Sequence, residues 1–252
     1  MGSFRGRRGF TIVEVMMFLA ISGLLAVGIM ATATLGINNQ RYKDAVNTFQ
    51  SLVQREFVNT TQIFNNRENG KKCPDDSGNP SLRGAADCVI MGRLMAISTS
   101  GEIRSYNLVG RKEPNPAVSL DGSSSDAKII SAHRPVIDWG TVRTESLPWD
   151  TKLAGSKKKA SIIILRSPRS GNVYSYVIRE DLSNPGMAAG LNLFTAGLDA
   201  IDTNQKDRYI CIDRSGWTTS PERAVMIAKW SNGPGGVSQV DTPDPEGGKC
   251  SE

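Results

Sequence analysis

The chain has 252 residues, of which 39% are hydrophobic and 22% charged, with a formal net charge of +5. His133 is its only histidine and its four cysteines form no Cys-x-x-Cys pair, which excludes a His-rich zinc site and disfavours Ser-His-Asp and Cys-His enzymes. Arg5, Arg7 and Arg8 supply three of the positive charges, and the remaining +2 is weak evidence for a nucleic-acid partner. We expect neither an enzyme nor a bound cofactor or metal.

The amino terminus is a short basic segment, residues 1–9, followed by an apolar run from Phe10 to Ile37 whose only ionisable residue is Glu14. This run of 28 residues exceeds the roughly 20 that a helix needs to cross a bilayer. We therefore expect it to be retained as an anchor rather than removed as a signal peptide. The arginines before it predict a cytoplasmic amino terminus and an exported remainder.

Glu14 is a carboxylate inside this predicted membrane segment. Such a group costs about 2.5 to 3.5 kcal/mol on insertion scales and usually faces a partner. The alternative is a carboxylate near the membrane boundary that snorkels to the headgroups or is protonated.

The sequence from Arg8 through Gly9 and Phe10 to Glu14 resembles the leader and mature start of type IV pilins and type II secretion pseudopilins. The shared features are a basic leader ending in Gly, then Phe-Thr-x-x-Glu and a long apolar helix. The resemblance covers roughly the first 55 residues. It implies cleavage after Gly9 and N-methylation of Phe10 by a prepilin peptidase and methylase, and a long helix joined to an antiparallel head. Cleavage there would create an amine on Phe10 at the same membrane depth as Glu14, and the amine of a neighbouring chain would neutralise Glu14.

The helix is expected to continue beyond the membrane. Over 40–64 apolar residues recur mostly at spacings of three and four, and no proline occurs before Pro74. We predict one helix over 10–64, about 80 Å long, with a transmembrane and assembly part over 10–37 and an amphipathic stem over 38–64.

Residues 65–252 are predicted to form an exported, disulfide-bonded, β-rich head that begins with a connecting loop over 65–87. The expected strands are Cys88–Ile97 with Glu102–Val109, Ser161–Arg166 with Val173–Arg179, Arg208–Asp213 with Ala224–Trp230, and the weaker Lys128–Ser131 and Val136–Trp139. A short helix is expected within Gly186–Ala200 and a loop over Pro234–Glu252. The predicted fold class is α+β, a long N-terminal helix packed on an antiparallel sheet. The length allows a two-sheet head, as in some minor pseudopilins.

All four cysteines lie on the predicted export side, which favours disulfides in an oxidising compartment. Three pairings are open from the sequence. The simplest joins Cys73 to Cys88, closing the loop after the stem, and Cys211 to Cys250, fastening the tail to a strand. The second link resembles the disulfide-bounded carboxyl-terminal region of many pilins.

An acidic loop collects the oxygen ligands Asp199, Asp202, Asn204 and Asp207, and some pseudopilins bind calcium in such a region. Lys206 occupies a ligand position and no bidentate glutamate closes the loop, so a solvated turn is the better interpretation.

Basic residues cluster in the second half of the chain, in a pattern that would suit DNA phosphates, as in minor pilins used for DNA uptake. They are Lys157, Lys158, Lys159, Arg166, Arg169, Arg179, Arg208, Arg214 and Arg223. Acids interleave with them and no aromatic stacking pattern accompanies them. We therefore favour a solvated charge set that protects sheet edges.

Together these features predict a subunit of a type IV pilus-like filament. It would be a single-pass precursor in the cytoplasmic membrane, with its head exported, and then part of a cell-surface pilus. Its partners would be other pilin subunits, the prepilin peptidase, the membrane and the assembly machinery. Two alternatives stay open: a minor pilin or pseudopilin that primes assembly or binds DNA, and a membrane-tethered extracellular binding domain. The sequence does not separate roles in adhesion, motility and DNA uptake.

Overall fold

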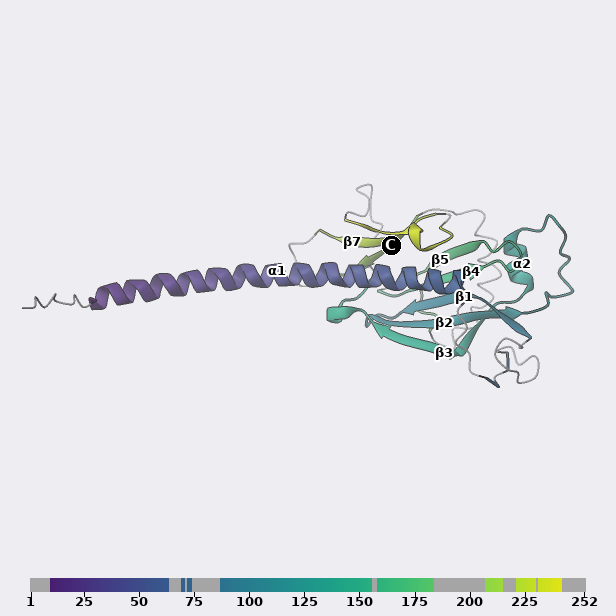
Figure 1. The fold of residues 1–252 in the computed structure, drawn as a ribbon, viewed down its shortest axis with the longest axis horizontal. Helices are drawn as coiled ribbons and strands as arrows, with labels where there is room; N and C mark the ends of the chain where they lie inside the picture. The colour runs from purple at the N-terminus through teal and green to yellow at the C-terminus, as the bar shows by residue number, and fades with distance from the viewer. Residues whose placement is uncertain are drawn as a thin grey trace, which may run out of the picture.

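The computed structural model describes residues 10–63, 69–70, 72–73, 87–155, 158–183, 207–214, 221–229 and 231–241. It consists of a long N-terminal helix, α1 (Ile12–Thr61), followed by a head of antiparallel sheets. The N-terminal half of α1 projects away from the head, and its C-terminal half lies along the head (Figure 1). The predicted α+β class, with a long helix packed on an antiparallel head, is confirmed.

The C-terminal half of α1 belongs to the core of the head. Its buried residues are Tyr42, Ala45, Val46, Phe49, Leu52, Val53, Glu56, Phe57 and Thr60. Spacings of three and four place them on one face, because the helix turns once every 3.6 residues. The large apolar members of this face share one hydrophobic cluster with both sheets, so the stem cannot leave the head without opening the core.

The larger sheet has five antiparallel strands in the order β3-β2-β1-β4-β5. They are β1 (Cys88–Ile97), β2 (Glu102–Arg111), β3 (Val136–Ser146), β4 (Ala160–Arg166) and β5 (Val173–Ile178). Alternate residues of a strand face opposite sides. On β4, Ile162 and Ile164 join the cluster under α1, whereas Ile163 and Leu165 join a second cluster on the other side of the sheet. Both hairpins predicted for this sheet are present.

The smaller sheet has the order β6-β7-β8, with β6 (Arg208–Ile212), β7 (Arg223–Ile227) and β8 (Val237–Val240). The β6–β7 pair was predicted, but the loop expected over Pro234–Glu252 is wrong for its first part. A short 3-10 turn, η3 (Pro234–Gly236), leads into β8, where Val237 is buried. Pairing with β7, rather than local composition, orders this segment.

The strand expected at Lys128–Ser131 is also wrong, because these residues lie in a helix, α2 (Asp126–Ala132). The Ser125 side chain caps this helix by accepting a hydrogen bond from the Lys128 N–H at 3.3 Å. The Ile129-Ile130 pair resembles a strand in sequence, but Ile130 packs against the second cluster. The short helix expected within Gly186–Ala200 lies outside the described residues.

β3 is longer than the predicted Val136–Trp139, because it continues through an irregularity in its pairing with β2. Thr141 bonds to both strands at this irregularity. Its Oγ1 accepts a hydrogen bond from the Asn107 N–H at 3.0 Å and donates one to the Asp138 carbonyl at 2.7 Å. This side chain replaces the missing ladder bonds, so the strand resumes as far as Ser146.

Candidate assembly and membrane site

The N-terminal half of α1 presents an apolar surface that the rest of the chain leaves uncovered. Sixteen large apolar side chains between Phe10 and Ile37 are exposed. Among the described residues, α1 is the one helix long and apolar enough to cross a membrane. Full burial of a side chain of this kind contributes about 1.5 to 3 kcal/mol, so a covering partner would gain roughly 25 to 50 kcal/mol before ordering costs. An exposed apolar surface of this extent marks a site of contact with a membrane or with other protein chains.

Glu14 lies in the first turn of α1, and its carboxylate folds back over the start of the helix. The Thr11 backbone N–H and Oγ1 donate to Glu14 Oε2 at 3.0 and 3.1 Å. In return, Thr11 Oγ1 accepts from the Glu14 N–H at 3.3 Å. This capping box satisfies backbone donors that have no partner within a helix. Its usual signal, a Thr three residues before a Glu, is present in the sequence but was not used in the prediction.

The capping box holds the Glu14 carboxylate close to the position where a mature amino terminus would begin. Phe10, 85% exposed, directly precedes Thr11, whereas Gly9 lies outside the described residues. Both Thr11 hydrogen bonds end on Oε2, and Oε1 accepts none from the residues that the structure describes. The carboxylate is therefore oriented and has an oxygen available for an amine from another chain.

Polar contacts fasten the stem to the smaller sheet. The buried Tyr42 hydroxyl donates to the Ile212 carbonyl at 3.1 Å and accepts from the Arg223 N–H at 2.9 Å. Burial raises the pKa of Tyr42, so it stays a neutral donor. Further along α1, the Gln50 amide donates to the Val237 carbonyl at 3.1 Å. These bonds place β6, β7 and β8 at fixed positions along the helix.

A buried ion pair fastens the stem to the larger sheet. Arg93 Nε on β1 lies 2.8 Å from Glu56 Oε2 on α1, and the exposed fractions of the two side chains are 2% and 0%. Arg93 Nη1 also donates to the Asn107 side-chain carbonyl on β2. This pair could not be predicted from the sequence, because nothing local marks two residues 37 positions apart as partners.

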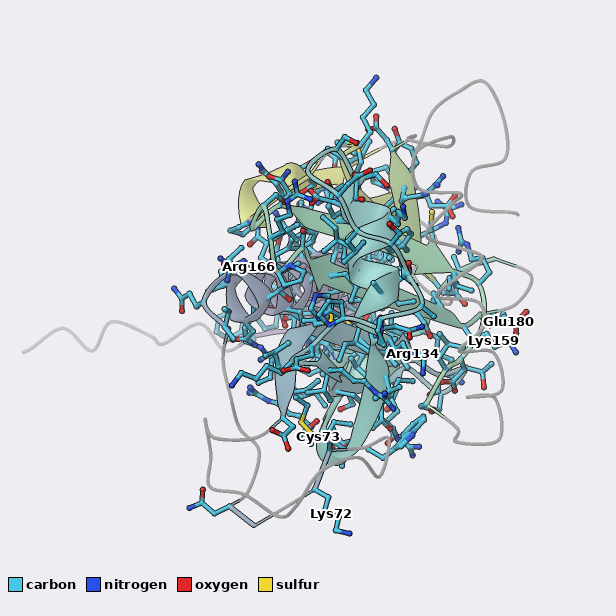
Figure 2. All side chains as sticks on the ribbon, turned by 90° about the vertical axis from the view of Figure 1, so that its right-hand side faces the viewer. Lys72, Cys73, Arg134, Lys159, Arg166 and Glu180 are labelled. Atoms are coloured by element: carbon cyan, nitrogen blue, oxygen red, sulfur yellow. A yellow bond between two sulfur atoms is a disulfide. The ribbon has the colours of Figure 1, made fainter. Side chains whose placement is uncertain are left out.

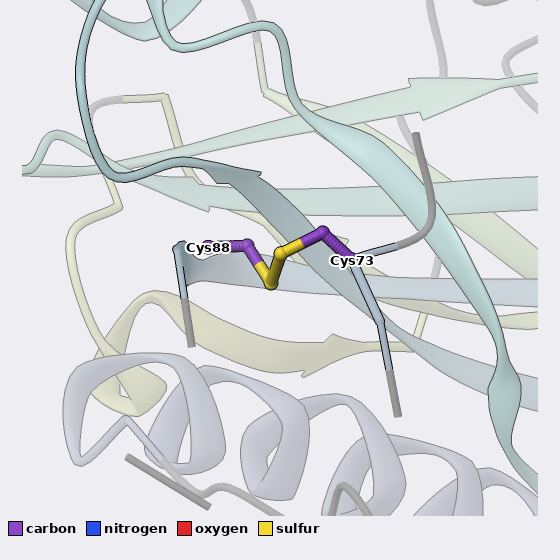
Figure 3. Close-up of a disulfide and its surroundings, with 2 residues drawn as sticks. All are labelled: Cys73 and Cys88. Atoms are coloured by element: carbon purple, nitrogen blue, oxygen red, sulfur yellow. A yellow bond between two sulfur atoms is a disulfide. The ribbon is translucent and has the colours of Figure 1, made fainter. Parts of the chain in front are cut away.

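The structure contains the first of the two predicted disulfides (Figure 3). Cys73 bonds to Cys88, the first residue of β1, with 5.9 Å between their Cα atoms. Cys211, buried on β6, is also disulfide-bonded. Cys250 lies outside the described residues, so its link to Cys211 stays a prediction.

Most of the basic residues considered for DNA are engaged within the head, whereas Lys157 lies outside the described residues. Their contacts include Arg166 to the Thr61 carbonyl (3.4 Å), Arg169 to the Asp121 carbonyl (2.9 Å), Arg179 to the Tyr209 carbonyl (3.1 Å), Arg223 to Asp241 (3.1 Å) and Lys159 to Glu180 (2.8 Å). Arg208 and Arg214 also have partners. Figure 2 views the head from the end opposite the projecting helix and shows Lys159 and Glu180 together at one side. These contacts fit a structural charge set.

Two of the remaining candidates for chemistry, Asp207 and His133, have structural roles. Three residues of the acidic loop, Asp199, Asp202 and Asn204, lie outside the described residues. The fourth, Asp207, accepts a hydrogen bond from the Lys229 N–H at 2.8 Å. Within the described part of the chain no three acidic, His or Cys side chains gather as metal ligands. His133 ends α2, and its Nδ1 lies 2.7 Å from the Arg111 carbonyl oxygen.

Comparison with protein families supports the interpretation of the amino terminus. The prokaryotic N-terminal methylation motif matches residues 4–30. This motif is the class III prepilin leader of type IV pilins and pseudopilins, so the chain carries a prepilin-type amino terminus. It points to a structural subunit rather than an enzyme. No curated protein and no solved structure matches the chain.

Proposed function

We propose that this protein is a structural subunit of a type IV pilus-like filament. In this proposal a prepilin peptidase removes residues 1–9 and methylates Phe10. The precursor spans the cytoplasmic membrane once, through residues 10–37, and exports its head. The assembly machinery then adds it to other pilin subunits on a surface filament. The observation that carries the proposal is the uncovered apolar half of α1, which continues into a stem built into the head.

The exposed half of α1 suits a helical polymer. A contact repeated between identical subunits extends indefinitely when its rotation does not close. Apolar side chains supply attraction between stems, but they define axial register poorly, because sliding exchanges one set of similar contacts for another. The amine of an incoming Phe10 next to Glu14 of a subunit in place would define one register. Other registers would leave a buried charge unpaired.

The capping box supports this role for Glu14. Thr11 fixes the carboxylate at the start of α1 before any partner arrives, so less side-chain freedom is lost on pairing. A membrane tether that stays monomeric would use this carboxylate only as a helix cap, whereas a filament subunit would also pair it with an incoming amine. Major and minor subunits would both use this pairing of Glu14 with an amine. An antibody to the head would separate them, because it would label the whole shaft for a major subunit and the tip for a minor one.

Substitution of Glu14 tests the proposal in a strain that lacks the wild-type copy. Glu14→Gln removes the charge, but glutamine still forms a capping box. We expect membrane insertion, leader cleavage and head folding to be unchanged, while the yield of sheared filaments falls about tenfold or more, since an unpaired buried charge costs several kcal/mol. The control is Glu102→Gln, a half-buried carboxylate of the head that pairs with Arg104. Wild-type yield from Glu14→Gln subunits would contradict the pairing mechanism.

A further inference from the structure

A tryptophan is displayed beside α1 where the helix enters the head. The short turn η1 (Pro148–Asp150) carries Trp149, whose Nε1 donates to Asp44 Oδ2 at 2.9 Å. The Arg41 guanidinium carbon lies 4.8 Å from the centre of the indole ring. The side chain is still 50% exposed. Its polar atom is satisfied by the stem, and half of its surface remains available to a partner.

The position of Trp149 along α1 corresponds to the edge of a membrane. Arg41 and Asp44 follow the end of the apolar run at Ile37 by about 6 and 10 Å along the helix, at 1.5 Å per residue. A bilayer has a hydrocarbon core of about 30 Å inside a total of about 40 to 45 Å, which leaves about 5 to 8 Å for each headgroup layer. A membrane-spanning α1 therefore places Trp149 in or next to the headgroup layer on the exported side, where tryptophan is enriched.

The turn that carries Trp149 is held in an uncommon conformation. Trp149 and Asp150 have φ angles of 61° and 53°, in the left-handed region that residues other than glycine rarely adopt. The flanks are fastened: the Leu147 N–H donates to the Gly101 carbonyl at 3.0 Å, and Leu147 itself is buried. A strained, fastened turn that displays an indole points to a role for the displayed ring.

The apolar part of α1 is longer than the hydrocarbon core of a bilayer is thick. From the residue after Glu14 to Ile37, α1 is about 35 Å long, against a hydrocarbon core of about 30 Å. A longer span is accommodated by tilting, here by about 30°, and interfacial Trp and Arg side chains set the direction of tilt. We propose that Trp149, stacked with Arg41, is an anchor that binds the phospholipid headgroup layer on the exported side. It would thereby set the direction in which α1 of the unassembled subunit tilts in the bilayer. This inference rests on the membrane-anchored precursor proposed above.

Depth-dependent fluorescence quenching tests the anchor. The mature full-length chain is reconstituted in phosphatidylcholine–phosphatidylglycerol vesicles that carry a nitroxide either on the headgroup or deep in the acyl chain. We expect stronger quenching by the headgroup nitroxide, and loss of most of this difference in Trp149→Phe. The matched control is Trp139→Phe, because Trp139 packs edge-on against Tyr106 on the larger sheet, at 5.1 Å between ring centres. That variant should keep the full difference.

Vesicle flotation in the same samples separates this inference from the proposed function. If the wild-type chain fails to float with the vesicles, the membrane-anchored precursor and the anchor are both wrong. If it floats, and Trp149→Phe retains the full headgroup quenching, only the anchor is overturned. The anchor is also overturned if Trp149→Phe lowers filament yield without any change in lipid quenching, because the ring would then be a contact between subunits.

Discussion

Replacing Arg93 with methionine should loosen the stem from the head. The change removes the charge partner of Glu56 and the donor to the Asn107 side chain, while a long apolar side chain fills much of the space. Glu56 is fully buried, so its carboxylate cannot regain the lost interaction from water.

The expected loss follows from the contacts that remain. Removing one partner of a buried ion pair costs about 3 to 5 kcal/mol. Glu56 keeps two weaker neighbours, Arg55 Nη2 and Asn59 Nδ2, each at 3.4 Å. We therefore expect the lower end of the range, about 3 kcal/mol. At about 2 to 4 °C per kcal/mol for a chain of this size, the Tm of Arg93→Met should fall by about 6 to 12 °C.

Thermal unfolding of the mature full chain in detergent, followed by near-ultraviolet circular dichroism, measures this loss. The matched control is Arg104→Met, because Arg104 Nε lies at the same 2.8 Å from Glu102 Oε1 but the two side chains are 42% and 34% exposed. An exposed pair contributes at most about 1 kcal/mol, so this Tm should fall by less than about 4 °C. Equal shifts for the two variants would refute the claim that burial makes the Glu56–Arg93 pair important.

Two further predictions concern the head. Peptide mapping without reductant should recover Cys73–Cys88 and Cys211–Cys250 with no free thiol. Cys73→Ser should lower the free energy of unfolding by about 3 kcal/mol, as expected for a 15-residue separation. Four free thiols would contradict export of the head to an oxidising compartment. Asp126→Asn should lower the Tm at neutral pH by an amount that shrinks below about pH 4. Burial opposes ionisation of Asp126, but side-chain hydrogen bonds outweigh it and lower the pKa, so its contribution is present above the unfolded pKa of about 3.9 and is lost as the pH falls. A difference that does not depend on pH would contradict that role.

The stem and the main hairpins could be predicted because their signals are local. Buried residues of the stem recur with helical spacing, and a Ser-Thr-Ser-Gly turn separates the apolar runs of β1 and β2. Gly101 in that turn has a φ of +85°, the left-handed conformation that favours glycine. Such patterns depend only on residues that are close together in the sequence, so they can be recognised without knowledge of the fold.

The missed features depend on contacts between distant parts of the chain. β8 has four residues after a Gly-Pro-Gly-Gly stretch, and only pairing with β7 orders it as a strand. The strand predicted at Lys128–Ser131 is a helix instead, and the capping signal of Ser125 was not used in that prediction. The Glu56–Arg93 pair joins two elements across the core.

In the candidate site, too, features with a local sequence signal could be predicted and features that depend on distant contacts could not. The uncovered apolar half of α1, with Glu14 in its first turn, could be predicted, because one carboxylate in a long apolar run is visible in the sequence. Its capping by Thr11 had a recognised local signal that was not used. The display of Trp149 beside Arg41 could not be predicted, since it depends on how a turn between β3 and β4 meets the stem.

The mass of the chain recovered from sheared filaments shows whether it is a processed filament subunit. We expect purified filaments to contain a chain that begins at Phe10 and carries one added methyl group. Gly9→Val should leave the precursor in the membrane with residues 1–9 attached. Absence of the chain from filaments, a retained leader, or a chain cleaved beyond the apolar run would show that it is not such a subunit.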